Sequence, residues 1–132
     1  MAALARAYLQ AHPEALRYHQ LTSYTYRNIS QENHNKLLFQ DSSVDGLKTG
    51  YTRNSGYNLL ATAKRGDQRL IAVVLKAKSR TIREEEALRL LNFGFEQSGL
   101  LPGTQQLDVP LNSEGRALPP RENAEETSPE GV

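Results

Sequence analysis

Residues 57–76 constrain the fold most, because they contain two β-rich segments separated by a short turn-forming stretch. Segments 57–64 and 69–76 flank the sequence Arg-Gly-Asp-Gln, and Gly with Asp between two such runs is typical of a β-hairpin. The second segment carries Leu-Ile-Ala-Val-Val-Leu, which is apolar on both faces of a strand. We therefore expect this strand to be buried at the centre of a sheet.

Four further segments precede the hairpin. Residues 2–11 predict a helix with apolar pairs at i, i+4, ending where His12 precedes a proline. Residues 21–27 are β-branched and aromatic and predict a strand, and residues 29–39 are expected to be extended with an irregular middle. Residues 44–52 are expected to form the central strand, entered through a turn at 41–43.

A second helix is predicted over residues 81–97. Thr81 and Glu84 have the spacing of a capping box, and three consecutive glutamates are expected in the first turn. Gly99 and Pro102 would end the helix. An apolar stripe is expected to pack it on the hairpin: Leu88, Leu91 and Phe95.

Charge and composition divide the chain near residue 100. Residues 1–100 hold 14 Lys/Arg and 9 Asp/Glu, a balance of +5, whereas residues 101–132 hold 2 and 6, a balance of −4. We expect a first unit at 1–100 and an acidic, Pro-rich tail at 101–132 that is disordered from about residue 112. A positive balance suits an anionic ligand, although it is also typical of ordinary solvation.

Several classes of function are not indicated. No Lys/Arg block is interleaved with aromatic residues, so nucleic acid is not an expected partner. The absence of cysteine excludes disulfides and thiolate metal sites, and His12, His19 and His34 lack ligand spacing, so neither a metal nor another cofactor is expected. The N-terminal residues do not resemble a signal peptide, and no 18-residue apolar run predicts a membrane span.

The main candidate site is the stretch Val-Asp-Gly-Leu-Lys-Thr-Gly-Tyr-Thr at residues 44–52. Lys48 supplies a point charge with three donors, and Thr49 supplies a hydroxyl. Gly46 and Gly50 allow a ligand to approach the backbone closely. This combination suits an anion, but Lys-Thr-Gly alone is equally consistent with a solvated lysine at the edge of a strand.

The surrounding motifs give a more specific indication. The stretch 44–52 is followed by Gly-Tyr-Asn-Leu-Leu-Ala at 56–61, and it is accompanied by Asn-His-Asn-Lys-Leu-Leu-Phe at 33–39, by Arg83 and by Leu-Leu-Asn-Phe-Gly-Phe at 90–95. Over residues 1–96 the chain resembles the serine-type D-alanyl-D-alanine carboxypeptidases of the S11 peptidase family, the low-molecular-mass penicillin-binding proteins. The resemblance covers the C-terminal part of their catalytic domain. It implies an α/β fold of the DD-peptidase/β-lactamase type, an antiparallel sheet with packed helices.

The resemblance also implies roles for individual residues. Lys48, Thr49 and Gly50 match the family's third motif, which binds the terminal carboxylate of the substrate. The backbone N–H of Tyr51 would donate to the oxyanion, and Arg83 would bind the carboxylate as well. We expect Lys48 and Arg83 to lie on the same side of the sheet, able to share one carboxylate. Implied ligands are peptidoglycan stem peptides ending in D-Ala-D-Ala and β-lactams, and the implied location is periplasmic or extracytoplasmic.

Two motifs that such enzymes need are missing. No serine precedes a lysine by three residues, and none precedes an asparagine by two, so S-x-x-K and Ser-x-Asn are absent. One hypothesis is a truncated carboxypeptidase whose nucleophile half lies upstream or on another chain, with that half as a partner. The alternative is a non-catalytic remnant that binds peptides or acts structurally. A class A β-lactamase is a third and weaker possibility.

Overall fold

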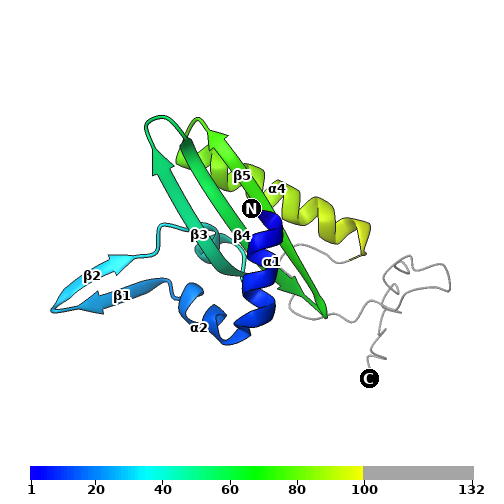
Figure 1. Cartoon of the computed structure of the whole chain (residues 1–132), viewed down its shortest axis with the longest axis horizontal. Helices are drawn as coiled ribbons and strands as arrows, with labels where there is room; N and C mark the ends of the chain where they lie inside the picture. The colour runs from blue at the N-terminus through cyan, green and yellow to red at the C-terminus, as the bar shows by residue number, and fades with distance from the viewer. Residues whose placement is uncertain (100–132) are drawn as a thin grey trace, which may run out of the picture.

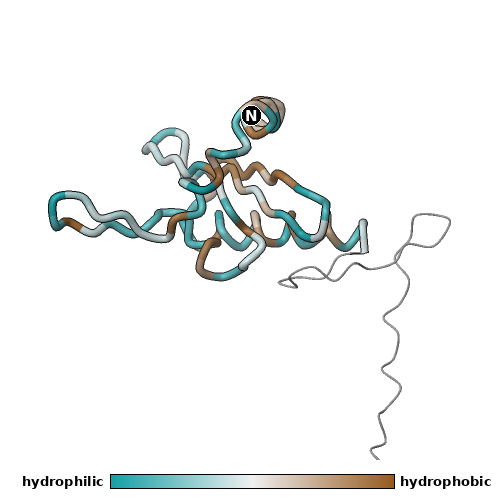
Figure 2. The backbone as a smooth tube through the Cα atoms, turned by 90° about the horizontal axis from the view of Figure 1, so that it is seen from below, coloured by the Kyte–Doolittle hydropathy of each residue, from teal (hydrophilic) through white to brown (hydrophobic). Residues whose placement is uncertain are grey.

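The computed structural model of the chain describes residues 1–99. A three-stranded antiparallel sheet lies between helices, and a separate two-stranded hairpin projects to one side (Figures 1 and 2). The elements, in chain order, are α1 (Ala2–Ala11), the 3₁₀ turn η1 (Pro13–Ala15), α2 (Leu16–His19), β1 (Ser23–Tyr26), β2 (Ile29–Glu32), α3 (Leu37–Gln40), β3 (Val44–Thr52), β4 (Gly56–Arg65), β5 (Gln68–Ala77) and α4 (Arg80–Gln97). The tail expected at 101–132 lies outside the described residues.

The sheet has the order β3-β4-β5. The strand predicted at 44–52 is confirmed as β3, but its predicted central position is wrong, because β4 is the middle strand. The apolar run in β5 also proves to be in an edge strand: Ala72 and Val74 are buried, while Leu75 is 62% exposed. Packing of α4 and α1 against β5 explains why an edge strand is apolar on both faces.

Both hairpin turns have the chemistry that tight turns require. Gly66 and Asp67 form the loop between β4 and β5, which is shorter than expected because Arg65 pairs with Gln68 as the last rung. Gly66 has φ +57°, as the first central residue of a type II′ turn needs. Between β1 and β2, Arg27 and Asn28 both have positive φ, as in a type I′ turn.

Helix α1 is confirmed with its predicted bounds, but α4 begins differently from the prediction. The N-cap is Ser79, whose Oγ accepts a hydrogen bond from the Ile82 N–H at 3.1 Å. The capping box predicted from Thr81 is therefore wrong, and the glutamates lie beyond the first turn. Residues 29–39 begin as the strand β2 and have the expected irregular middle at 33–36, but their last part is helical, in α3, and not extended.

The hydrophobic core lies between α4 and one face of the sheet. The predicted stripe on α4 is confirmed: Leu91 and Phe95 are buried, and Leu88 packs at the margin of the core. The sheet contributes five buried residues to this core, three of which are alanines: Leu59, Ala61 and Ala63 of β4 with Ala72 and Val74 of β5. Consequently α4 covers the face that carries the odd-numbered residues of β4.

A buried ion pair ties this core to the start of β3. Arg65, 2% exposed, donates to Asp41 Oδ2 at 2.7 Å, to Asn92 Oδ1 at 2.8 Å and to Ser43 Oγ at 3.1 Å. Its guanidinium also lies 4.4 Å from the centre of the Phe95 ring. The turn before β3 is thus held to β4 and α4 by one side chain.

Candidate functional site

The Lys-Thr-Gly motif lies on the open edge of the sheet. Residues 48–50 belong to β3, which pairs with β4 on one side only. Lys48, Gly50 and Tyr51 are exposed, and Thr49 is half-buried. An edge strand of this kind presents unpaired backbone groups to solvent, so a ligand can bind alongside the motif.

The register fixes which backbone groups of β3 are available. The Lys64 N–H donates to the Ser43 carbonyl at 2.9 Å, so the even-numbered residues of β4 direct their backbone groups towards β3. Lys48 pairs with Leu60 and Gly50 with Asn58, so these two are the hydrogen-bonded rungs. By alternation, Thr49 and Tyr51 direct their N–H groups away from β4, towards the open edge.

Side chains of the motif are divided between the two faces of the sheet. Thr49 pairs with Leu59, and Tyr51 with Tyr57, so both lie on the face that α4 covers. The two tyrosine rings stack with centroids 4.4 Å apart. Lys48, opposite Leu60, extends from the other face, and its Nζ donates back to the Thr49 carbonyl. The cation and the hydroxyl therefore reach the open edge from opposite sides.

Arg83 lies on α4 and is only 3% exposed. Its Nη2 donates to the His34 carbonyl at 3.3 Å and to Glu84 Oε1 at 3.1 Å, while its Nε is buried without a partner. The expectation that Lys48 and Arg83 lie on the same side of the sheet is wrong, because Lys48 extends from the face opposite α4. Thr49 is the motif side chain that shares a face with Arg83.

Sequence reasoning missed a polar contact that fixes β3 just before the motif. The Asn35 Nδ2 donates to the Gly46 carbonyl at 3.0 Å, and Asn35 is 3% exposed. The run at 33–35 was part of the family resemblance, but nothing in its spacing indicated which strand it would contact.

The three histidines lie in different environments. His12 and His34 are exposed, as expected, whereas His19 is half-buried, with its Nε2 2.8 Å from the Tyr8 hydroxyl oxygen. Within residues 1–99, no group of three metal-ligating side chains is present. No helix in the same range is long and apolar enough to cross a bilayer.

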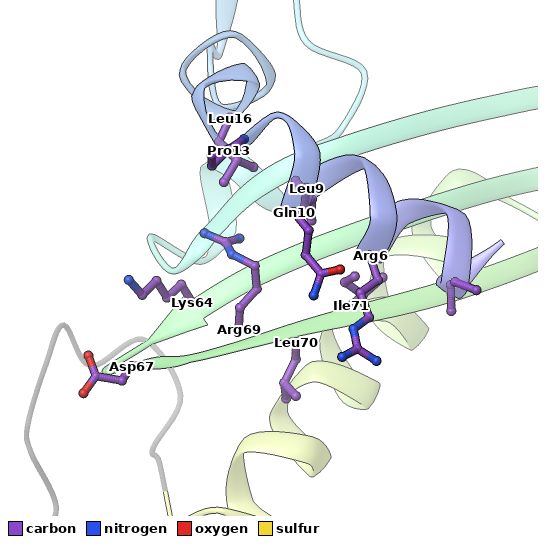
Figure 3. Close-up of a pocket in the computed structure, with 12 residues that line it drawn as sticks. Arg6, Leu9, Gln10, Pro13, Leu16, Lys64, Asp67, Arg69, Leu70 and Ile71 are labelled. Atoms are coloured by element: carbon purple, nitrogen blue, oxygen red, sulfur yellow. The ribbon is translucent and has the colours of Figure 1, made fainter.

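A groove of about 910 Å³ lies away from the motif, between α1 and the β4–β5 end of the sheet (Figure 3). Arg6 and Gln10 line it from α1, and Lys64, Arg69 and Ile71 line it from the strands. Arg69 already forms a bidentate pair with Asp45, at 2.7 and 2.8 Å. The groove is therefore the partly filled junction of α1 with the sheet, and the motif does not contribute to it.

Known proteins with similar sequences are D-alanyl-D-alanine carboxypeptidases. A sequence profile described as D-alanyl-D-alanine carboxypeptidase, peptidase S11, matches residues 1–79. The chain is 46% identical over 96 residues to the D-alanyl-D-alanine carboxypeptidase DacC of Escherichia coli and 46% identical over 95 residues to DacD of the same organism. These matches cover 72% and 71% of this chain but 24% of each relative, so the chain spans about a quarter of their length.

Solved structures agree with the sequence matches. Penicillin-binding protein 6B from Escherichia coli superimposes with a TM-score of 0.66 at 45% identity, covering 71% of this chain and 30% of the other. Penicillin-binding protein D2 from Listeria monocytogenes, in its cefotaxime-bound form, gives a TM-score of 0.66 at 34% identity, covering 70% and 38%. The fold is thus that of part of a penicillin-binding DD-peptidase domain. The profile match over more than half of the chain shows that this protein belongs to the D-alanyl-D-alanine carboxypeptidase family.

Proposed function

We propose that this chain supplies the carboxylate-binding wall and one oxyanion donor of a serine-type D-Ala-D-Ala carboxypeptidase site. The observation that carries the proposal is the position of Lys48-Thr49-Gly50 on the open edge of β3, with the Tyr51 N–H directed away from β4. Substrates would be peptidoglycan stem peptides ending in D-Ala-D-Ala, and β-lactams would occupy the same edge. A cell-wall substrate implies that this activity is located outside the cytoplasm.

Each residue of the edge has a distinct proposed role. The terminal carboxylate of an extended peptide binds beside Lys48 and Thr49, where one ammonium and one hydroxyl can both donate to it. Gly50 leaves room for the peptide beside the backbone, since it has no Cβ and nothing lies within 4 Å of where one would be. The scissile carbonyl oxygen then accepts from the Tyr51 N–H, which stabilises the negative charge that develops there. Arg83 is proposed to contribute to substrate binding from the face of Thr49, separately from the carboxylate that Lys48 binds.

The nucleophile is proposed to come from polypeptide outside these 132 residues. A serine Oγ would attack the scissile carbonyl carbon, and collapse of the tetrahedral intermediate would break the C–N bond and release protonated D-Ala. Water would then hydrolyse the acyl-enzyme and regenerate the serine. The sequence contains no S-x-x-K and no Ser-x-Asn, which supports a partner segment that is upstream in the gene or on another chain.

Labelling with a fluorescent penicillin tests the assignment of the nucleophile. We expect no covalent band on a denaturing gel for the 132-residue chain, because loss of the nucleophile alone costs about 10⁶ in turnover in a comparable serine hydrolase. A complete carboxypeptidase of the family serves as the positive control. A stoichiometric band would show that a serine within this chain performs the acylation, and the proposal would then be wrong.

The gene sequence distinguishes a catalytic assembly from the alternative hypothesis, a non-catalytic domain that only binds peptides. An in-frame S-x-x-K and Ser-x-Asn upstream of the codon for Met1 would support a catalytic assembly. Their absence, together with binding of N-acetyl-D-alanine by the chain, would favour a peptide-binding module without chemistry.

A further inference from the structure

Three consecutive residues, Asn33, His34 and Asn35, each bond a different part of the fold. The Asn33 Nδ2 donates to the Leu21 carbonyl at 2.9 Å and to the His19 carbonyl at 3.3 Å, at the end of α2. The His34 carbonyl accepts from Arg83 of α4, and Asn35 donates to Gly46 of β3. We call residues 33–35 the strap, because they connect α2, α4 and β3.

Within the strap, Asn35 is held in one orientation. Its Oδ1 accepts from the Leu37 N–H at 3.3 Å, and its own N–H donates to Asn33 Oδ1 at 2.9 Å. With the oxygen occupied by a donor, the Nδ2 is the end of the amide that faces the Gly46 carbonyl. Because the side chain is 3% exposed, water does not compete for these bonds.

Gly46 is tightly enclosed on the side away from α4. A Cβ there would lie 3.2 Å from Thr62 Cγ2 and 3.4 Å from His19 Cβ. The pairing of β3 with β4 shifts register between Val44 and Gly46. The regular hydrogen bonds between the two strands are interrupted there, so they do not by themselves fix the position of Gly46 relative to β4. The bond from Asn35 fixes the backbone at this irregularity, two residues before Lys48.

We propose that Asn35 is a positioning residue for the Lys48-Thr49-Gly50 motif, setting the place of the edge strand relative to α2 and α4. Arg83 helps to hold β3 indirectly, because it donates to the His34 carbonyl and the next residue, Asn35, donates to Gly46 of β3. The functional consequence rests on the proposed carboxypeptidase role of the motif. An edge strand is held by one neighbour only, and binding groups lose effect when displaced by about 1 Å, so a second attachment is needed.

Amide hydrogen exchange of the 132-residue Asn35→Asp variant tests the proposal. At neutral pH the introduced carboxylate still accepts from the Leu37 N–H but cannot donate to Gly46. We expect the Lys48 and Gly50 amides to exchange about ten-fold faster or more than in the unmodified chain, while β4–β5 amides change less than about two-fold. The difference should shrink as the pH falls, because the introduced carboxyl group, once protonated, can donate to the Gly46 carbonyl again. Uniform acceleration, or no change at β3, would overturn the proposal.

Two further variants keep this test decisive. Asn92→Asp is the matched control, because it makes the same chemical change at an amide that accepts from Arg65, and it should not selectively affect β3. Arg83→Lys keeps a charge beside Glu84 but removes the guanidinium bonded to His34, and it should accelerate the same β3 amides. If Asn35→Asp does not fold, the proposal is tested with Arg83→Lys alone. Unchanged exchange of the Lys48 and Gly50 amides in that variant would overturn it.

Binding of N-acetyl-D-alanine, detected through the amide chemical shifts of β3, separates the carboxylate-binding role of the motif from the positioning role of Asn35. If the unmodified chain does not bind it, the carboxylate-binding role fails, while the exchange result still decides the role of the strap. Weaker binding by at least about ten-fold in Asn35→Asp, with β4–β5 exchange unchanged, supports positioning of the motif. Equal binding by both chains refutes it.

Discussion

Replacing Arg65 with methionine tests the buried ion pair that connects β3, β4 and α4. Methionine approximates the length of the aliphatic stem and its contact with Phe95, but it removes the donors to Asp41, Asn92 and Ser43. Asp41 is 6% exposed, so its carboxylate would remain buried without its cation. The variant therefore measures what an uncompensated buried charge costs this fold.

The expected loss is about 3–5 kcal/mol in the free energy of unfolding, the range for breaking a buried pair by removing one partner. A domain of this size is stable by about 5–15 kcal/mol in total, so this is a large fraction. Asp41→Asn should also destabilise, because it leaves Arg65 buried without a counter-charge. The double variant should cost clearly less than the sum of the two, because both charges are then gone.

Acid unfolding gives an independent measure of the same pair. Burial, the largest single influence, raises the pKa of Asp41, but hydrogen bonds from the Ser43 hydroxyl and N–H and the charge of Arg65 outweigh it. The pKa is therefore lowered from its ordinary value of 3.8. A lowered folded-state pKa contributes stability above pH 3.8 that is lost as the pH falls through the folded pKa. Asp41→Asn should remove this part of the pH dependence.

Urea denaturation of the 132-residue chain, followed by circular dichroism between pH 2 and 7, provides the measurement. The unmodified chain and the two single variants are compared with the double variant at equal concentration. A cost below about 1 kcal/mol for Arg65→Met, or strict additivity in the double variant, would refute the reasoning.

Two simpler substitutions test other features. Ser79→Ala should lower the free energy of unfolding by about 1 kcal/mol, because it removes the N-cap of α4, whereas Thr81→Ala should change it by less than about 0.5 kcal/mol. Thermal melts of the two variants provide the comparison. A greater loss for Thr81→Ala would show that Thr81, and not Ser79, caps the helix. Lys48→Met should leave stability within about 0.5 kcal/mol of the unmodified chain, since Lys48 is exposed, but should abolish binding of N-acetyl-D-alanine measured by NMR. Undiminished binding would exclude Lys48 from the site.

Local patterns predicted the elements with the strongest periodicity. The β4–β5 hairpin, α1 and the buried stripe of α4 follow from apolar spacing and turn residues, which depend only on near neighbours in sequence. The Lys-Thr-Gly motif was also recognisable, because its residue types and its flanking motifs are contiguous.

Features that depend on distant contacts were not predictable in the same way. An apolar run such as that of β5 indicates cover on both faces, and it does not distinguish a central strand from an edge strand between two helices. Ser79 and Thr81 are both acceptable caps, and only the tertiary position of α4 decides between them. Arg65 was expected in a loop, because nothing nearby in sequence reveals Asp41 as its partner, 24 residues away.

The open edge of β3 has a consequence for handling this protein. Unpaired N–H and C=O groups that can receive a peptide can equally receive the same strand from another copy of the chain, in either direction. Within β3, Asp45 is paired with Arg69, so Lys48 is the exposed charge of this strand, and lysine is a residue with which natural sheets discourage such pairing. The ammonium group of Lys48 thus opposes association of β3 strands between copies, in addition to its proposed role in binding a carboxylate. Variants that remove this charge should be studied at low protein concentration.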